Sequence, residues 1–318
     1  MVALSHHFPF DPTYGYTLEE LLAVEPPDPP PDFATFWEER YAEAMGIDPE
    51  PTLDRSRFAL PRHEVLALGY RSTNGFCIRG WLLRPLQGPV NRAFILGHGY
   101  KELQRPDHHL PFADAVYLVP CFRGLGRSRR APISPEPDWH ILHDIDKPEG
   151  YILGGCVADV WTGVSALLEL YPEVAGRIGY MGISFGGGVG ALAMPWDTRL
   201  ARVHLNIPSL GHQPLRLRLP TAGSAAALQR YRAEHGNVLA ILCYYDAAIA
   251  ARYMDRPVHV AAARFDPMVA PPGQFAIHNA LGAERHLSVL DAGHFDYPQR
   301  PHQQQELMGE LRTFFEPL

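Results

Sequence analysis

Short apolar runs alternate with longer amphipathic or apolar stretches over most of the chain. The short runs, which have the length of buried strands, lie at 92–96, 115–120, 178–181, 203–207, 258–262 and 286–290. The longer stretches, which favour helices, lie at 157–170, 185–194, 274–281 and 303–315. Strands that alternate with helices in this way predict an α/β fold, with a mostly parallel sheet covered by helices on both faces.

The N-terminal part departs from this alternation. Residues 18–24 and 33–45 predict two helices that are separated by prolines, which cannot continue a helix. Asp32 is the expected N-cap of the second helix, and Gly46 is its expected end. We interpret residues 1–60 as a helical lead-in to the sheet.

Two other segments also depart from the alternation. Residues 64–84 contain two strand-like runs joined through Asn74 and Gly75, and Asn-Gly between apolar runs favours a β-hairpin. Residues 209–256 do not continue the strand–helix rhythm, so we expect a helical insertion over the active-site end of the sheet. The 318 residues fit one domain that carries this insertion.

Composition excludes several classes of protein. The formal net charge of −7, without a long basic run, argues against a nucleic-acid binder. No uninterrupted apolar stretch approaches the roughly 18 residues of a membrane span. The four cysteines lie far apart, which argues against a zinc site or a dense disulfide framework. The N-terminus has no signal-peptide pattern, so we expect a cytoplasmic protein.

A candidate nucleophile lies between a predicted strand and a predicted helix. Gly182-Ile183-Ser184-Phe185-Gly186 matches G-x-S-x-G, in which a serine occupies a sharp strand-to-helix turn and small flanking residues allow the tight backbone. A serine without a catalytic role in a glycine-rich turn would match the same motif. The strand RIGYM before the motif and the apolar stretch GGGVGALAM after it favour the nucleophile.

A serine hydroxyl needs a base, and the base needs a carboxylate that orients it. In the α/β-hydrolase fold these partners follow the serine in the order acid, then histidine. Asp266 follows the strand at 258–262, and His294 follows the strand at 286–290, so both are expected at the carboxyl edge of the sheet. Asp291 is the main alternative for the acid, and Asp246 and Asp255 are less well placed.

The developing oxyanion needs two hydrogen-bond donors. One is expected to be the backbone N–H of Phe185, which follows the nucleophile. The other is expected to be the backbone N–H of Tyr100, in the loop Gly97-His98-Gly99-Tyr100 after an early strand. This chemistry requires neither a cofactor nor a metal.

These motifs together resemble the acetyl xylan esterase and cephalosporin C deacetylase family of carbohydrate esterases over nearly the whole chain. The similar segments are DFATFWEER, GWLLRP, GHGYK, FRGLGRS, GISFGGG, YYDAAIAARYMDRPVHVAAARFDPMVAPPGQFAIHNA and GHFDY. The long block is the most specific, because it places Asp266, the proline pair 271–272 and Asn279 in register with the family pattern.

The resemblance implies a serine esterase that removes short acyl groups, chiefly acetyl, from xylo-oligosaccharides or similar small alcohols. It also implies a homo-oligomer. The chain departs from the family pattern at Leu125 and Phe185, where the family has glutamine, and at 151–155, where the family is rich in tyrosine and arginine. A general carboxylesterase with a broader acyl range therefore stays an alternative.

Other classes of protein are less favoured. His140, His143, Asp144 and Asp146 could suggest a metal site, but surrounding prolines and the lack of an H-E-x-x-H motif favour solvated loop histidines. A non-catalytic binding protein on a hydrolase fold would normally lack a triad residue. A prolyl-oligopeptidase-type enzyme would need a propeller domain, and a dienelactone-type hydrolase would use cysteine as nucleophile.

Overall fold

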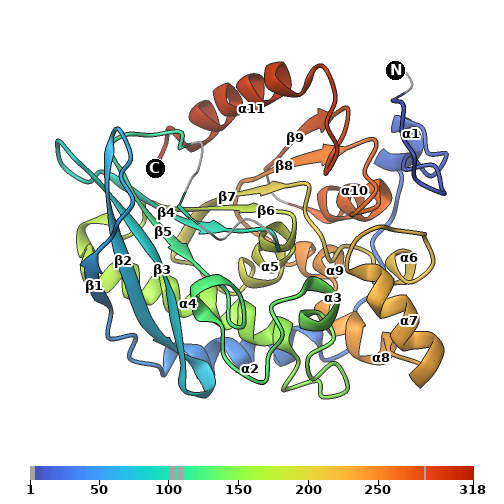
Figure 1. The fold of residues 1–318 in the computed structure, drawn as a ribbon, viewed down its shortest axis with the longest axis horizontal. Helices are drawn as coiled ribbons and strands as arrows, with labels where there is room; N and C mark the ends of the chain where they lie inside the picture. Colours follow the sequence, from blue (N-terminus) through green and yellow to red (C-terminus); the bar gives the residue numbers. More distant parts are fainter. Residues whose placement is uncertain (1–3, 101–104, 107–109, 283) are drawn as a thin grey trace.

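The computed structural model describes residues 4–100, 105–106, 110–282 and 284–318. Within these ranges nine strands form one sheet (Figure 1). The strands are β1 Thr52–Arg55, β2 His63–Ser72, β3 Phe76–Pro85, β4 Arg92–Gly97, β5 Ala115–Pro120, β6 Ile178–Ile183, β7 Leu200–Asn206, β8 Val258–Ala263 and β9 Arg285–Leu290. Their order is β1-β2-β3-β5-β4-β6-β7-β8-β9. The six strands β4 to β9 are parallel to one another. β1 pairs antiparallel with β2, β2 with β3, and β3 with β5.

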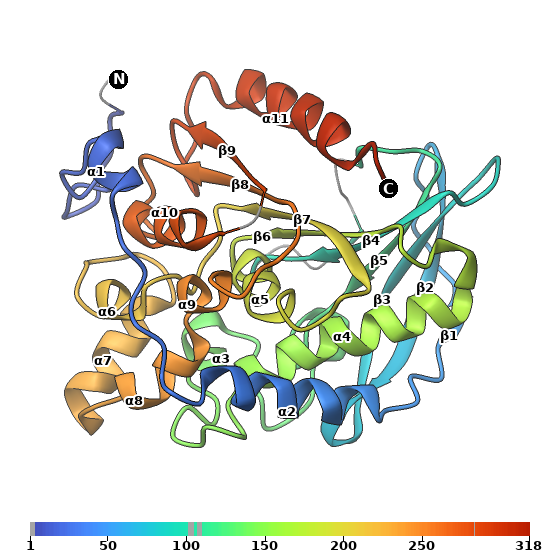
Figure 2. The same cartoon turned by 180° about the vertical axis from the view of Figure 1, so that it is seen from behind.

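Helices cover both faces of the sheet, as expected for an α/β fold. They are α1 Leu18–Leu22, α2 Phe33–Met45, α3 Pro137–His140, α4 Ile152–Leu170, α5 Phe185–Ala193, α6 Gln213–Arg216, α7 Ala225–His235, α8 Leu239–Leu242, α9 Ala247–Ala251, α10 Pro271–Ala280 and α11 Arg300–Phe315. Short 3-10 helices lie at Thr73–Gly75, Gly126–Ser128, Pro172–Val174 and Cys243–Tyr245. In Figures 1 and 2, α4 and α5 lie on one face with α2 outside α4, and α11 lies along the opposite face.

The predicted hairpin is confirmed. β2 and β3 pair antiparallel, and Asn74 and Gly75 in the turn between them both have positive φ, 58° and 62°. Asparagine and glycine tolerate this left-handed backbone better than other residues. The hairpin joins the parallel part of the sheet because β3 pairs antiparallel with β5.

Three expectations for other segments need correction. Residues 1–60 are not purely helical, because β1 lies within them and pairs with β2. Asp32 does not cap α2 with its side chain; its Oδ1 instead accepts a hydrogen bond of 2.6 Å from the Tyr244 hydroxyl. α4 begins at Ile152 rather than near 157, so Gly155 lies inside the helix. A Cβ on Gly155 would lie 2.5 Å from the Arg123 side chain, so glycine fits a close contact there.

The segment 209–256 forms α6, α7, α8 and α9, as the broken strand–helix rhythm predicts. α9 packs against α5 and α10, and α7 packs against α3. These contacts join the segment to α3, α5 and α10, and α5 is the helix that follows Ser184 (Figure 1).

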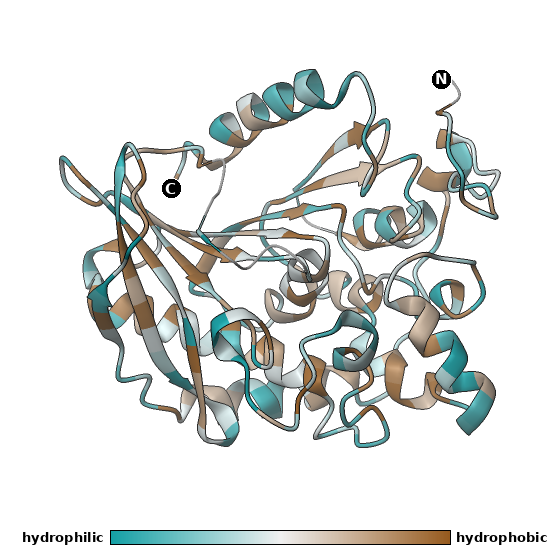
Figure 3. Cartoon of the chain, in the orientation of Figure 1, coloured by the Kyte–Doolittle hydropathy of each residue, from teal (hydrophilic) through white to brown (hydrophobic). Residues whose placement is uncertain are grey.

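Apolar residues concentrate in the sheet and in the helices that pack on it. Figure 3 shows hydrophilic residues along α11 and at the outer end of α7, while the sheet strands are largely hydrophobic. Of the described helices, α4 alone is long and apolar enough to cross a membrane, but 78% of its most apolar window is buried inside the protein. Its hydropathy is that of a core helix packed against α2, α5 and the sheet.

Candidate active site

The strand-to-helix turn places Ser184 in an unusual backbone conformation. Ser184 lies between β6 and α5 with φ 54° and ψ −113°. The turn closes tightly because Gly186 approaches the β4 loop: a Cβ there would lie 2.3 Å from the carbonyl carbon of Gly97. A Cβ on Gly182 would likewise meet the backbone of Gly186 at 2.5 Å. Such backbone strain is typical of functional turns, and here the flanking glycines make it sterically possible.

The structure brings the three predicted triad residues into one chain of hydrogen bonds. His294 Nε2 lies 2.8 Å from Ser184 Oγ, and His294 Nδ1 lies 2.8 Å from Asp266 Oδ2. Ser184, Asp266 and His294 follow β6, β8 and β9, whose carboxyl ends lie at the same edge of the parallel part of the sheet. The arrangement can take a proton from the serine onto the imidazole while the carboxylate stabilises the resulting charge.

The Asp266 carboxylate is fully buried, and both of its oxygens accept hydrogen bonds. Its Oδ1 accepts hydrogen bonds of 2.9 Å from the backbone N–H groups of Met268 and Val269. Its Oδ2 accepts from Gln274 Nε2 at 3.0 Å as well as from His294. Gln274 on α10 was not among the residues expected at the site, although it lies in the long block that resembles the esterase family.

The alternative carboxylates lie elsewhere. Asp246 caps α9 and accepts from the backbone of His212, Gln213 and Ala248, and its burial raises its pKa to about 6. Asp255 pairs with Arg256. Asp291 donates its backbone N–H to the Gln303 side chain at 3.0 Å. Asp266 is the carboxylate that contacts the histidine.

The loop after β4 is held against the nucleophile turn. Gly186 N–H donates to the His98 carbonyl at 2.9 Å. The buried His98 imidazole contacts the Gly99 carbonyl through Nδ1 and accepts from the Phe122 N–H through Nε2, at 2.8 and 3.0 Å. His98 therefore braces the backbone next to Tyr100, a role that the sequence motif did not indicate.

The side chains of the two residues expected to supply the oxyanion donors are in contact. The rings of Tyr100 and Phe185 are stacked, with centroids 4.3 Å apart. Phe185 is the first residue of α5, so its backbone N–H has no partner inside the helix and the positive end of the helix dipole lies here. The phenylalanine that departs from the family pattern is thus an aromatic packing partner of Tyr100.

The second departure, Leu125, lies in a loop held by a buried ion pair. Leu125 is 1% exposed, so an apolar side chain fits this position. In the same loop Arg123 donates to Asp159 at 2.6 Å and to the hydroxyl groups of Ser72 and Thr73. Because a buried charge is costly unless it is paired and hydrogen-bonded, Arg123 has a structural role in fixing this loop.

His140 is not a solvated loop residue, which corrects the sequence interpretation. It ends the short helix α3, which has Pro137 in its first turn, and its side chain is fully buried. Its Nε2 lies 2.9 Å from the Arg123 carbonyl, and its Nδ1 lies 3.1 Å from the Tyr100 hydroxyl. A neutral imidazole satisfies both contacts by donating from Nε2 and accepting at Nδ1. Burial lowers the pKa of His140 to about 4.

This burial predicts an acid-dependent loss of stability. The pKa of His140 is lowered from 6.5 when unfolded to about 4 when folded, so the unfolded chain binds the proton more readily. The stabilisation is complete above pH 6.5 and is lost as the pH falls toward 4, by about 3 kcal/mol for a shift of this size. In His140→Gln, the free energy of unfolding in urea should fall less between pH 7 and 4.5 than in the native protein.

The neighbouring His143 supplies the control for that experiment. Its side chain is 24% exposed and lies 3.7 Å from Asp144. His143→Gln should keep the native pH dependence of unfolding. An equal change in both variants would contradict the assignment of the acid sensitivity to His140.

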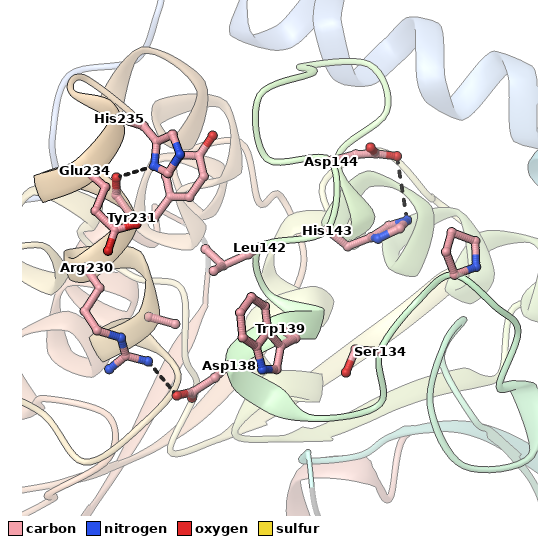
Figure 4. Close-up of a pocket in the computed structure, with 12 residues that line it drawn as sticks. Ser134, Asp138, Trp139, Leu142, His143, Asp144, Arg230, Tyr231, Glu234 and His235 are labelled. Atoms are coloured by element: carbon pink, nitrogen blue, oxygen red, sulfur yellow. Dashed lines mark hydrogen bonds and ion pairs between the residues drawn. The ribbon is translucent and has the colours of Figure 1, made fainter.

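Two other residues of this His/Asp cluster, His143 and Asp144, line a groove. Within the described part of the chain, no group of three or more His, Cys, Asp or Glu side chains could hold a metal ion. The groove has a volume of about 760 Å³ and lies between α7 and the segment that includes α3 (Figure 4). Its lining residues are Pro132, Ser134, Asp138, Trp139, Leu142, His143, Asp144, Ala227, Arg230, Tyr231, Glu234 and His235.

Adjacent residues of α3 face the groove and the protein interior. Trp139 is 67% exposed at the groove, whereas the next residue, His140, points inward to Tyr100 and Phe185. Arg230 bridges the groove to Asp138 at 2.8 Å. The residues that line the groove do not include Ser184, Asp266 or His294.

Comparison with solved structures shows the fold. Acetyl xylan esterase from Paenibacillus sp. R4 is 20% identical, with a TM-score of 0.80 over 93% of this chain and 99% of that one. Acetyl xylan esterase 1 from Thermoanaerobacterium sp. JW/SL YS485 is also 20% identical, with a TM-score of 0.76 over 95% and 99%. Pyrococcus horikoshii acylaminoacyl peptidase is 14% identical, with a TM-score of 0.63 over 81% of this chain and 42% of that one. The fold is therefore the α/β-hydrolase fold of esterases and peptidases.

Comparison with family models extends this result to the sequence. A search of curated protein sequences gives no match. Residues 13–310, which include all three triad candidates, match the model described as acetyl xylan esterase (AXE1). This match covers most of the chain. The chain therefore belongs to the acetyl xylan esterase family of carboxylic ester hydrolases.

Proposed function

We propose that this protein hydrolyses short-chain acyl esters, chiefly acetates, through a covalent acyl-enzyme on Ser184. The observation that carries the proposal is the chain of 2.8 Å contacts from Ser184 through His294 to Asp266. Ser184 Oγ attacks the ester carbonyl carbon as His294 Nε2 takes its proton. Asp266 holds the imidazole with its proton on Nδ1 and stabilises the imidazolium that forms.

The negative charge on the carbonyl oxygen needs donors that are already in place. The backbone N–H groups of Phe185 and Tyr100 are the proposed donors, and each such donor is worth about 3 kcal/mol of transition-state stabilisation. When the tetrahedral intermediate collapses, His294 returns the proton to the departing alcohol. Water, activated by the same imidazole, then attacks the acyl-enzyme and releases the carboxylic acid.

The proposed substrate is a small acetylated alcohol such as an acetylated xylo-oligosaccharide. Family membership and the two structural neighbours described as acetyl xylan esterases support this substrate. A general carboxylesterase is the second candidate, since Phe185 and Leu125 replace family glutamines with apolar side chains.

A substrate series separates the two candidates. Initial rates would be measured for aryl acetate, propionate, butyrate and octanoate, and in parallel for acetylated xylo-oligosaccharides and cephalosporin C. For the acetyl esterase, kcat/KM should fall at least about tenfold from acetate to butyrate, because larger acyl groups lose the fit in the transition state, and acetate should be released from the sugar. Equal kcat/KM values up to octanoate without sugar deacetylation would favour the general carboxylesterase.

A further inference from the structure

The N-terminal segment contains a short aromatic strap, which we define as residues 4–16. Its second half is a self-supporting turn in which Asp11 accepts from the backbone N–H and the hydroxyl of Thr13, at 2.9 and 2.7 Å. Tyr14 N–H donates back to the Asp11 carbonyl at 3.0 Å. The strap runs beside α10 and the ends of β8 and β9 in both views (Figures 1 and 2).

The strap contacts the loop that carries the acid of the proposed triad. The Pro12 carbonyl accepts the backbone N–H of Asp266 at 3.0 Å. The His6 ring packs edge-on against Phe265, the residue before Asp266, with centroids 5.4 Å apart. A backbone hydrogen bond and a ring contact at adjacent positions fix both the path and the orientation of this loop.

The strap also contacts the loop that carries the base. The Phe8 ring packs edge-on against Phe295, the residue after His294, with centroids 6.1 Å apart. Phe295 in turn lies 5.0 Å from Phe265. The two loops are thus joined to each other and to the strap by one aromatic cluster, which is separate from the main hydrophobic core.

A third contact connects the strap to the segment 209–256. The Tyr14 hydroxyl donates to the Pro220 carbonyl at 2.7 Å. The next residue, Thr221, donates its hydroxyl to the Met268 carbonyl at 2.9 Å, and Met268 N–H itself donates to Asp266. The acid loop is therefore enclosed by the strap on one side and by the insertion on another.

We propose that the strap is a positioning element that holds Asp266 and His294 in register with Ser184. This inference rests on the proposed function, because it assigns the strap a role in that same triad. Residues 4–12 precede the part of the chain that matches the family model, so the contacts of His6, Phe8 and Pro12 come from outside the match, whereas Tyr14 lies within it. The strap residues touch the loops of the triad rather than the substrate, and they act through His294 and Asp266.

The test compares two phenylalanines of the strap. Phe8→Ala removes the ring that packs on Phe295, whereas the ring contacts of Phe10 are with Phe8 and Tyr14 inside the strap. Phe8→Ala should lower kcat for an aryl acetate about tenfold with KM within about twofold, because small displacements of catalytic groups cost rate rather than binding. Phe10→Ala should keep kcat within about twofold, and Phe8→Tyr, which keeps the ring, should restore it.

Hydrogen exchange tests the same inference without any activity. In Phe8→Ala the backbone amides of 264–269 and 291–296 should exchange faster, with the amide of Asp266 included, while β6 and α5 keep native protection. Native exchange in both loops together with native kcat would overturn the proposal, as would equal kcat losses in Phe8→Ala and Phe10→Ala. If Ser184 proved dispensable, the proposed function would fail, while the exchange data would still report whether the strap holds these loops.

Discussion

Replacing Ser184 by alanine should lower kcat for an aryl acetate by about four to six orders of magnitude, since the nucleophile and its base act as one unit. The fold should survive the change. Ser184 already has a positive φ of 54°, and alanine in this conformation is no more strained than serine. The measurement is kcat and KM of the purified variant together with its thermal unfolding. The residual rate should come from the oxyanion donors alone.

Ser209 offers a matched control close to the same turn. Its backbone N–H donates to the Ser184 carbonyl at 3.0 Å, and its buried hydroxyl has no hydrogen-bond partner in the described part of the chain. Ser209→Ala should therefore keep native kcat. A Ser184→Ala variant that retained a tenth of native turnover would rule out the covalent mechanism.

The parallel core of the sheet was predictable because its signal is local. Each buried strand is a short apolar run bounded by polar or glycine-rich residues, and each lies within three residues of its predicted bounds at both ends. The start of α4 was not predictable, because glycines 154–155 look like loop residues until Arg123 and Tyr245 are seen to pack against them. Only the folded chain shows that close contact.

The residues brought together at the site were predictable to a similar extent. Ser184 directly follows β6, and Asp266 and His294 lie in the loops just after β8 and β9, so chain order and strand ends placed them at one edge. Their supports depend on non-local contacts: Gln274 reaches Asp266 from α10, and Pro12 reaches it with a backbone carbonyl. A backbone carbonyl has no sequence signature, so the strap could not be found from the sequence.

His140 shows how local rules can mislead. Several prolines around it favoured a solvated loop, yet Pro137 lies in the first turn of α3, where its missing N–H costs nothing. The burial of His140 follows from its contacts with Tyr100 and Phe185, which are distant in sequence. The prolines therefore indicate where the helix begins, but they do not predict whether the histidine is buried or exposed.

Asp266→Asn should lower kcat by about four orders of magnitude, because it changes which imidazole nitrogen carries the proton. Asparagine Oδ1 can still accept from Met268 and Val269, so its Nδ2 would occupy the place of Oδ2 beside His294. An amide there donates to Nδ1 and leaves the proton on Nε2. The imidazole then points a donor at Ser184 and cannot take its proton.

The same substitution at Asp291 is the control, because Asp291 was the main alternative for the acid and lies three residues before His294. Asp291→Asn should keep kcat within about threefold, since it leaves in place the Asp266 carboxylate that accepts from His294. Rates for both variants would be measured from pH 5 to pH 9 to separate lost base function from a shifted optimum. A large loss in Asp291→Asn with native turnover in Asp266→Asn would reassign the acid, and the hydrogen bond from His294 to Asp266 argues against that result.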